Sequence, residues 1–324
     1  MAKVLIVGGA GYIGSHTVKH FLQHGYECVV VDNLVCGHRE AVPQEAIFEL
    51  ADLQNVESLR KVFAKHQFDA VVHFAAYSLV GESVGKPQKY YYNNVVGTLN
   101  LLDVMMENRV NKIVFSSTCA TYGNPQYVPL DEKHQQCPIN PYGQTKLVIE
   151  NIFKDYANAY GLKYIALRYF NAAGASFEGE IGESHNPESH LIPLVLKAIK
   201  GERENIKVFG SDYDTPDGTC LRDYIHVDDL AAAHRLAVEK VGEYSGFVNL
   251  GTGIPTSVLD IIKAAEKVSG KKCPVVYAER RAGDPSVLYA DNKKAKDVLG
   301  WEPKYKNIEQ IVSSAWNWEV NRLF

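Results

Sequence analysis

Short runs of apolar, often β-branched residues alternate with longer amphipathic stretches through the first half of the chain. The apolar runs, each of which predicts a β-strand, lie at residues 4–7, 28–31, 47–50, 70–74, 112–115 and 164–167. Between several of them the pattern predicts helices, at residues 56–65 and 91–108. Strands that are apolar throughout and alternate with helices are typical of a parallel sheet covered on both faces. The pattern therefore predicts an α/β fold with a doubly wound parallel sheet.

The rhythm changes after residue 171. Residues 177–190 are polar and contain glycine, which predicts a long loop, and helices are predicted at residues 191–200, 257–269 and 308–322. The stretch "FVNLGTG" at residues 247–253 has the form of a further sheet strand that ends at a loop. We therefore expect the chain to leave the first domain, form a smaller α/β domain, and return once to the first sheet.

Charge and composition narrow the possible partners. The chain of 324 residues has a formal net charge of −4, and its largest basic clusters are pairs such as Arg280-Arg281. Such a surface gives no electrostatic footprint for nucleic acid or for an anionic membrane. No apolar run reaches the length that spans a bilayer, and the cysteines lack Cys-x-x-Cys spacing. We expect a soluble, cytoplasmic protein with reduced thiols and with neither a nucleic-acid nor a membrane partner.

A glycine-rich turn joins the first predicted strand to the first predicted helix. In "VLIVGGAGYIGSH" the residues Gly8, Gly11 and Gly14 are spaced three apart. Such glycines allow a tight turn and close backbone approach, so that a pyrophosphate can lie at the positive end of the helix. Asp32 ends the second strand, where a carboxylate suits the ribose hydroxyls of NAD and repels the 2′-phosphate of NADP. The complete unit favours an NAD site over a plain α/β turn.

The same helix carries His16, His20 and His24, spaced four residues apart. This spacing can present two imidazoles to a metal ion, but no carboxylate or cysteine is placed nearby to complete a site. We interpret the three histidines as polar residues on a solvated helix face and predict no metal site.

The stretch "YGQTK" places Tyr142 and Lys146 one turn apart on a predicted helix that starts after Asn140. This helix follows the strand "KIVFSST", whose hydroxyl residues at 116–118 should lie at the carboxyl edge of the sheet, where α/β proteins bind ligands. A second stretch with this spacing, "YADNK" at residues 289–293, follows no strand of the cofactor unit and is interpreted as structural. The first pair is therefore the candidate for chemistry.

A tyrosine with an ordinary pKa near ~10 is a poor base at neutral pH. A neighbouring ammonium and a positively charged nicotinamide both favour the phenolate, so we expect a lowered pKa for Tyr142. Such a phenolate can deprotonate an alcohol while a hydride leaves the same carbon.

These features together resemble the extended short-chain dehydrogenase/reductase family. Its marks are Gly-x-x-Gly-x-x-Gly, a strand that bears serine and threonine, and Tyr-x-x-x-Lys. The similarity to the branch that epimerises UDP-hexoses at carbon 4 spans nearly the whole chain. It is carried by "GGAGYIGSH", "VVVDNL", "VVHFAAYSLVGESV", "YYYNNVVGTLNLL", "FSSTCATYG", "PYGQTK", "LRYFNAAGA", "RDYIHVDDLA", "NLGTG" and "RRAGDP".

The resemblance implies an isomerase that interconverts UDP-galactose and UDP-glucose with tightly bound NAD. In that scheme Tyr142 takes the proton of the sugar 4′-hydroxyl while hydride passes to the nicotinamide. The 4-keto sugar, held by its UDP, then turns over and receives hydride on its other face. Lys146 would hold the nicotinamide ribose and tune Tyr142, and Thr118, with Ser117 as the alternative, would orient the proton. The family also implies a homodimer through residues 91–108 and 142–160.

The resemblance further implies how the chain divides between the two ligands. Residues 1–175, with a return segment at about 223–253, would form an NAD-binding Rossmann domain, and residues 176–222 and 254–324 a UDP-sugar-binding domain. The implied NAD site comprises Gly8, Gly11, Tyr12, Ile13, Gly14, Asp32, Asn33, Asp52, Leu53, Phe74, Ala75, Ala76, Asn94, Ser116, Tyr142, Lys146, Tyr169 and Phe170. The implied substrate site comprises Thr118, Tyr142, Asn171, Leu191, Arg222, Arg281 and Asp284.

Several alternatives bear on this assignment. Guanidinium groups suit a diphosphate and a carboxylate suits a ribose, but Arg222 could instead form a structural ion pair with Asp223 or Asp229. Ser78 stands where relatives carry a lysine that reaches the NAD pyrophosphate. Leu288 is of intermediate size at a position that, by the resemblance, sets the width of the sugar pocket. N-acetyl UDP-sugars therefore stay open as alternative substrates, as do pentose and uronate UDP-sugars.

Two other functions are disfavoured. A 4,6-dehydratase needs acidic residues after the active-site threonine, and Thr118 is followed by Cys119 and Ala120. A catalytically inactive, NAD-sensing regulator would have lost the pair that this chain keeps in Tyr142 and Lys146.

Overall fold

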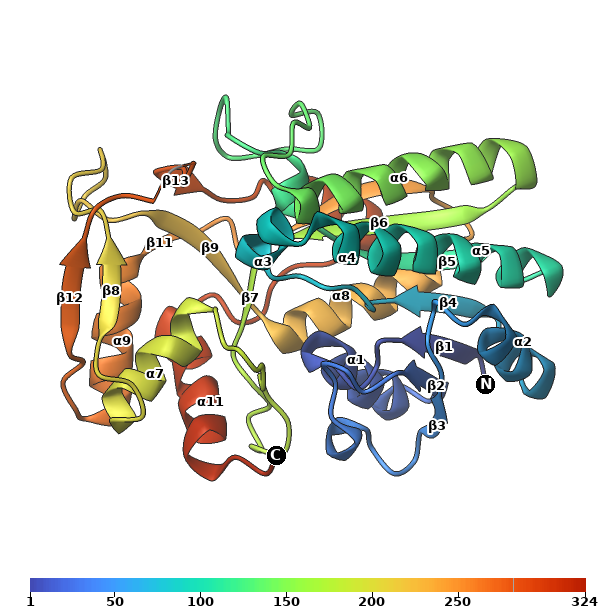
Figure 1. Ribbon diagram of the computed structural model, residues 1–324, viewed down its shortest axis with the longest axis horizontal. Helices are drawn as coiled ribbons and strands as arrows, with labels where there is room; N and C mark the ends of the chain where they lie inside the picture. The colour runs from blue at the N-terminus through green and yellow to red at the C-terminus, as the bar shows by residue number, and fades with distance from the viewer. Residues whose placement is uncertain (282) are drawn as a thin grey trace.

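The computed structural model describes residues 1–281 and 283–324. Its larger part is a seven-stranded sheet of order β10-β6-β5-β4-β1-β2-β3, in which all neighbouring strands are parallel (Figure 1). The strands are β1 (Lys3–Val7), β2 (Glu27–Asp32), β3 (Ile47–Leu50), β4 (Ala70–His73), β5 (Lys112–Thr118), β6 (Lys163–Tyr169) and β10 (Gly246–Leu250). The predicted parallel sheet is confirmed, and the late strand β10 does join its edge.

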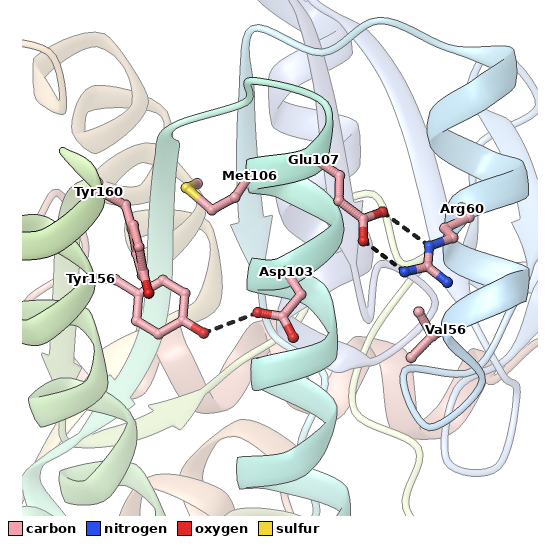
Figure 2. Close-up of a pocket in the computed structure, with 7 residues that line it drawn as sticks. All are labelled: Val56, Arg60, Asp103, Met106, Glu107, Tyr156 and Tyr160. Carbon is pink, nitrogen blue, oxygen red and sulfur yellow. Dashed lines mark hydrogen bonds and ion pairs between the residues drawn. The ribbon is translucent and has the colours of Figure 1, made fainter.

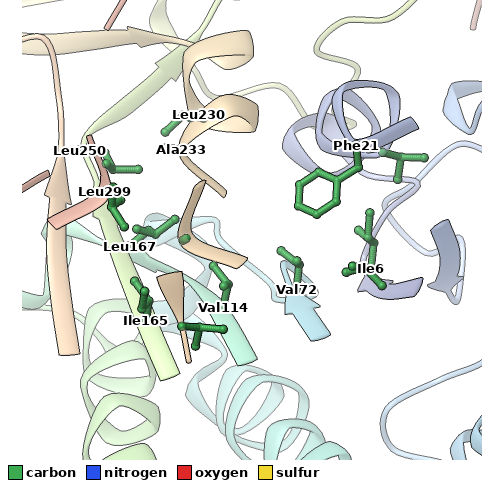
Figure 3. Packing of buried hydrophobic residues seen from close by; sticks show 14 of the residues in the cluster. Ile6, Phe21, Val72, Val114, Ile165, Leu167, Leu230, Ala233, Leu250 and Leu299 are labelled. Atoms are coloured by element: carbon green, nitrogen blue, oxygen red, sulfur yellow. The ribbon is translucent and has the colours of Figure 1, made fainter. Parts of the chain in front are cut away.

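Helices cover both faces of this sheet because alternate strand residues enter two different cores. Val4 and Ile6 pack with the helices α1 (Tyr12–Gln23), α8 (Val227–Lys240) and α10 (Lys293–Leu299). Figure 3 shows part of this core, with Phe21 of α1 beside Ile6. Leu5 packs on the opposite face with α2 (Val56–Lys65), α5 (Gly97–Glu107) and α6 (Pro141–Tyr160).

The smaller part is built from short strands and three helices, on the left of Figure 1. The strands β7 (Asn171–Ala173), β9 (Leu221–His226), β11 (Pro255–Ser257) and β13 (Val287–Leu288) form one sheet, and β8 (Ile206–Phe209) pairs with β12 (Val275–Ala278). The helices α7 (Leu191–Lys200), α9 (Val258–Ser269) and α11 (Ile308–Asn321) share an apolar core with them. The three helices were predicted. Most of these strands have too few residues for an apolar pattern.

The segment predicted as one helix at residues 91–108 is divided. It follows α3 (Val80–Gly85) and α4 (Pro87–Tyr90), and it begins with a π-helical segment, η2 (Tyr91–Val96), before α5. A wide turn of this kind often marks a functional position. Here the segment contains the buried Asn94, whose amide is held by the backbone of Tyr77. Single-turn 3₁₀ segments lie at η1 (Arg39–Ala41) and η3 (Cys119–Thr121).

The prediction of a solvated histidine face on α1 is wrong for His16. This side chain is buried, and its Nδ1 lies 2.9 Å from Asp228 Oδ1 on α8. The reason is that α8 packs along α1 and covers that face, whereas His24 near the helix end is exposed. Within the described residues, no helix combines the length and apolar character that crossing a bilayer requires.

Candidate active site

The turn between β1 and α1 is packed so closely that a side chain has no room at two of its glycines. Gly8 has a φ of +81°, and a Cβ atom there would lie 2.6 Å from the backbone nitrogen of Ala75. A Cβ atom at Gly14 would lie 2.1 Å from the Gly8 carbonyl oxygen. Gly11 caps α1 without a side-chain hydrogen bond from any described residue, so Tyr12 begins a helix whose first N–H groups face no side-chain cap. A helix start of this kind is suited to a pyrophosphate.

Asp32 is buried at the end of β2 and is held by the backbone. Its carboxylate accepts hydrogen bonds from the amides of Ala10 (3.0 Å) and Leu34 (2.9 Å). Burial raises the pKa of Asp32, and these amides oppose the rise. The Asn33 side chain, next in the chain, donates to Asp52 at 2.9 Å. The ends of β2 and β3 therefore present two carboxylates close to the glycine turn.

The chain after β4 packs against the same turn. The amides of Phe74 and Ala75 both donate to the Val7 carbonyl, at 2.8 and 3.1 Å. Asn94 accepts from the Tyr77 amide at 2.9 Å and donates to the Tyr77 carbonyl at 3.0 Å. These bonds commit the Asn94 amide, so this residue holds the loop at residues 74–77 in place.

Two further residues, Leu53 and Ser78, bear on the predicted cofactor site. Leu53 is buried, and a Cβ atom at Gly97 would lie 3.0 Å from its Cβ atom. Ser78 is exposed and supplies no charge, but the Lys89 ammonium lies 4.1 Å from the centre of the Tyr77 ring. A cation is therefore present beside the loop that carries Ser78.

The predicted start and end of the Tyr142 helix agree with α6. Asn140 accepts a hydrogen bond from the Gly143 amide at 2.8 Å, and Pro141 is the first helical residue. The helix ends at Gly161, which has a φ of +72°. Tyr142 and Lys146 thus lie on the first turns of α6, and the Lys146 ammonium donates to the Ser116 carbonyl at the end of β5, at 2.7 Å.

The electrostatics of this pair differ in part from the prediction. Burial lowers the pKa of Lys146 to about 7, and Glu150 opposes the change. Burial also raises the pKa of Tyr142, with Tyr169 adding to the rise and a hydrogen bond from Thr118 opposing it. The predicted lowering of the Tyr142 pKa is therefore wrong for the polypeptide itself, because burial outweighs its polar neighbours. Ionising this phenol requires a positive charge placed beside it.

The hydroxyl residues that end β5 lie on two faces of the strand. Side chains alternate along a strand, so Ser116 and Thr118 share one face and Ser117 takes the other. Thr118 interacts with Tyr142, as its effect on that pKa indicates. Ser117 donates instead to Glu150, at 2.7 Å, and is buried. Of the two candidate hydroxyls, Thr118 is the one beside Tyr142.

Tyr169, at the end of β6, lies next to this pair. It is the register partner of Thr118, and its phenol is hydrogen-bonded to the Ser116 hydroxyl. Burial raises the pKa of Tyr169 to about 12, and the Ser116 hydrogen bond opposes the rise. The neutral phenol therefore forms part of the wall around Tyr142.

The next residues carry the chain into the smaller sheet. Phe170 is buried in a small apolar cluster, against which Leu288 of β13 packs. Asn171 begins β7 and donates to the Asp223 carbonyl of β9 at 2.9 Å. Leu191 is half-buried and is the first residue of α7. The segment from Phe170 to Asn171 thus connects the edge of the large sheet with the residues predicted to hold the substrate.

Arg222, Arg281 and Asp284 form one ion-paired group. Arg222 of β9 pairs with one oxygen of Asp284, and Arg281 lies 3.0 Å from the other. The Arg222 side chain is 13% exposed and the Arg281 side chain 63%, so the group extends from the interior to the surface. Burial raises the pKa of Cys119 to about 12 and Arg222 opposes the rise, which places Arg222 near the residue after Thr118.

The alternative that Arg222 pairs with Asp223 or Asp229 is wrong. Asp223 accepts hydrogen bonds from the Thr252 amide (2.8 Å) and the Gly253 amide (3.0 Å). Asp229 accepts from the backbone of residues 304 and 305, both at 2.9 Å. Both carboxylates are thus committed to backbone amides, and Arg222 is left with Asp284.

A surface hollow of about 580 Å³ lies elsewhere, over α2, α5 and α6 (Figure 2). It is lined by Val56, Arg60, Asp103, Met106, Glu107, Tyr156 and Tyr160. Arg60 pairs with Glu107 at 2.6 Å, and Tyr156 donates to Asp103 at 3.0 Å. None of the predicted site residues lines this hollow, so we do not assign it to the substrate.

A parallel sheet whose carboxyl edge carries a glycine turn, an acidic strand end and a tyrosine–lysine pair defines a dinucleotide-dependent enzyme. The chain belongs to the NAD dependent epimerase/dehydratase family, whose model matches residues 4–251.

Individual relatives resemble the chain over almost its whole length. A UDP-glucose 4-epimerase of Halalkalibacterium halodurans is 52% identical, with 97% of this chain and 95% of that protein covered. The crystal structure of UDP-glucose 4-epimerase from Brucella ovis in complex with NAD has a TM-score of 0.95 and 50% identity, and 98% of each chain is covered. The enzyme from Bifidobacterium longum in complex with NAD+ and UDP has a TM-score of 0.93 and 39% identity, with 99% of each chain covered.

Proposed function

We propose that the chain is an NAD-dependent UDP-glucose 4-epimerase, an isomerase that interconverts UDP-galactose and UDP-glucose through a 4-keto sugar. The observation that carries the proposal is the half-buried Tyr142 with the buried Lys146 and Thr118, in a chain about half identical to UDP-glucose 4-epimerases over 97% of its length. Other members of the family use the same scaffold for other reactions, but the residues after Thr118 lack the acids of a dehydratase.

The residues of the glycine turn fit NAD. Gly8 brings the turn close to the chain after β4, Gly14 lets the start of α1 pack on Gly8, and Gly11 carries no side-chain cap among the described residues. Asp32 with Asn33 at the end of β2 suits the hydroxyls of the adenosine ribose. Bound NAD supplies the acceptor and donor of the hydride at carbon 4 of the sugar. The relative from Brucella ovis, solved in complex with NAD, supports this assignment.

Tyr142 is the base in this proposal. Its phenolate accepts the proton of the 4′-hydroxyl, and returns it when the opposite hydroxyl configuration forms. Thr118 orients that proton from the same face of β5, where Ser117 cannot reach it. Lys146 is fixed on the Ser116 carbonyl one helical turn after Tyr142, and its side chain, of pKa about 7, would hold the nicotinamide ribose and favour the phenolate.

The ion-paired group of Arg222, Arg281 and Asp284 is the proposed UDP site. A diphosphate competes with Asp284 for the two guanidinium groups, and this frees the carboxylate for the hydroxyls of the uridine ribose. Asn171 and Leu191 complete this side of the site. The relative from Bifidobacterium longum, solved with NAD+ and UDP, supports a UDP-binding role for the fold.

We also propose the division and assembly of the chain. Residues 1–175 and about 223–253 form the NAD-binding domain, and residues 176–222 and 254–324 the UDP-sugar-binding domain. The protein is a cytoplasmic homodimer through η2, α5 and α6, where Tyr92 is 56% exposed, Val96 39% and Tyr160 64%. Exposed apolar side chains of this size mark an interface. Sedimentation equilibrium of the wild type and of Val96→Glu would test it: a wild-type monomer would reject the dimer.

The decisive experiment is a coupled assay with UDP-galactose and no added NAD. We expect UDP-glucose to form, because the proposal requires carried cofactor and a closed hydride cycle. Parallel reactions with UDP-N-acetylgalactosamine, UDP-arabinose and UDP-glucuronate measure the width of the pocket near Leu288. Failure to convert UDP-galactose, even with NAD supplied, would reject the proposed substrate.

A further inference from the structure

The loop between β7 and α7 gathers four side chains of the kinds that bind metal ions. Glu183, His185, Glu188 and His190 each offer one ligand atom, and these four atoms all lie within 4.8 Å of one another. The sequence predicted no metal site, because the spaced histidines of α1 were the candidate ligands and no carboxylate or cysteine is placed nearby to complete a site. The ligand set here comes from an irregular loop, with the spacing Glu-x-His-x-x-Glu-x-His.

The four ligand atoms lie close enough together to surround one ion. His185 Nδ1 lies 3.1 Å from Glu183 Oε1 and 3.8 Å from Glu188 Oε2. His190 Nδ1 lies 2.6 Å from Glu183 Oε1 and 3.1 Å from Glu188 Oε1. A zinc ion with bonds of about 2.0–2.2 Å holds its tetrahedral ligand atoms roughly 3.3–3.6 Å apart. To reach that spacing the closest pair, at 2.6 Å, would open by about 0.7–1.0 Å, whereas the pairs at 3.1 and 3.8 Å would shift by roughly 0.2–0.5 Å.

One buried oxygen in the cluster indicates a cation independently of these distances. The Glu183 and Glu188 side chains are only 6% and 4% exposed. Among the described residues, Glu188 Oε2 has no hydrogen-bond partner. A carboxylate oxygen that is buried without a donor is costly unless it is paired or coordinates a metal. Mutual ion pairing of the two glutamates with the two histidines leaves this oxygen unsatisfied, whereas a metal ion satisfies it.

We propose that Glu183, His185, Glu188 and His190 bind one divalent cation of the zinc type. Imidazole nitrogens and carboxylate oxygens both suit zinc, and four protein ligands leave no open position for chemistry. The site is therefore structural, and the ion itself takes no part in the epimerase reaction.

The surroundings show what such an ion would fix. The Glu183 carbonyl accepts from Trp318 Nε1 at 2.9 Å, which anchors the loop to α11. The Tyr12 ring, at the start of α1, lies edge-on to the His185 ring at 6.3 Å. His190 is the N-cap residue of α7, directly before Leu191. An ion held here couples the glycine turn, the last long helix and the start of α7.

The test measures metal binding on the full-length, tag-free protein after treatment with a chelator and desalting. We expect one equivalent of added Zn²⁺ to be retained, and the unfolding temperature to rise by roughly 5 °C or more at saturation. Added Co²⁺ should give the intense visible absorption of a tetrahedral site. The double variant His185→Asn, Glu188→Gln should lose all three effects, and His24→Asn, which removes the exposed histidine that follows α1, should keep them.

Each result decides the question. Wild-type protein that retains no Zn²⁺, or that shows only the weak spectrum of octahedral Co²⁺, would overturn the site without reference to any variant. Equal retention by the wild type and the double variant would assign the ion to other residues. None of these readouts depends on epimerase activity, so failure of the site and failure of the proposed function are separate results.

Discussion

Two buried cations lie between α6 and the sheet, and they differ in how their charge is compensated. Lys146 and Arg168 are each 2% exposed. Arg168 makes a bidentate pair with Glu150, at 2.9 and 2.7 Å, and this pairing raises its pKa despite the burial. Lys146 has only the Ser116 carbonyl as its hydrogen-bond partner within the described chain, and burial lowers its pKa to about 7.

The difference separates a structural charge from a functional one. Glu150 lies four residues after Lys146 on the same helix, yet its oxygens bond to Arg168, Ser117 and Gln136. A buried, poorly compensated ammonium costs stability, and proteins retain such groups mainly at sites that use them. Burial alone does not distinguish the two cations. The placement of the Glu150 carboxylate does, because it pairs with Arg168 and not with Lys146.

The largest expected effect on turnover comes from Tyr142→Phe. The change keeps the ring and removes the hydroxyl, so turnover of UDP-galactose should fall by about 10²–10⁴-fold, the usual contribution of a general base. The midpoint of urea unfolding should stay the same. The coupled assay and an unfolding curve measure both. A variant that keeps a third of wild-type turnover would remove Tyr142 from the role of base.

For the structural ion pair, Glu150→Gln should destabilise the fold by about 3–5 kcal/mol, because it leaves the Arg168 guanidinium buried without a counter-charge. The variant protein that does fold should keep its turnover within a few-fold of wild type. The double variant Glu150→Gln, Arg168→Met is the matched control, and it should recover much of the lost stability. No loss in the single variant would mean that this pair contributes little.

Lys146→Met should have the opposite effects, with turnover lost and stability kept. Turnover should fall by about 10²-fold, as expected when a group that acts on a general base is lost. The free energy of unfolding should remain equal or increase, since an apolar side chain replaces a poorly compensated buried charge. The same assay and unfolding curves apply. A large loss of stability would show that Lys146 is a structural cation after all.

The Lys146 pKa also predicts a dependence of stability on pH. An unfolded lysine has a pKa near ~10.4, so between about pH 7 and pH 10 the unfolded state binds one proton more than the folded state. The free energy of unfolding therefore gains up to about 1.4 kcal/mol per pH unit from this group as the pH rises. Unfolding of wild type and Lys146→Met at pH 7, 8 and 9 isolates the contribution. If the free energy of unfolding changed with pH in the same way in both proteins, the lowered pKa of Lys146 would be contradicted.

The parts that could be predicted from sequence are those set by local pattern. The apolar runs gave the parallel sheet, Asn140 and Gly161 gave the ends of α6, and the glycine spacing gave the turn before α1. Roles that depend on contacts distant in sequence could not be predicted. The burial of His16 depends on α8, and the partner of Arg222 lies 62 residues further along the chain.

The smallest effects should come from the hydroxyls of β5, where the neighbouring residues Ser117 and Thr118 lie on opposite faces of the strand. Thr118→Val removes the hydroxyl beside Tyr142 at nearly constant shape, and turnover should fall by about 10-fold or more, at the low end of a proton-transfer contribution. Ser117→Ala removes one hydrogen bond to Glu150, which should cost about 1 kcal/mol of stability and leave turnover within two-fold, as Arg168 still pairs with that carboxylate. Since the two positions are adjacent, a general disturbance of β5 would affect both variants alike. If Thr118 acts in proton transfer and Ser117 only in packing, turnover should fall in the first variant alone, and equal turnover in both variants would reject that difference.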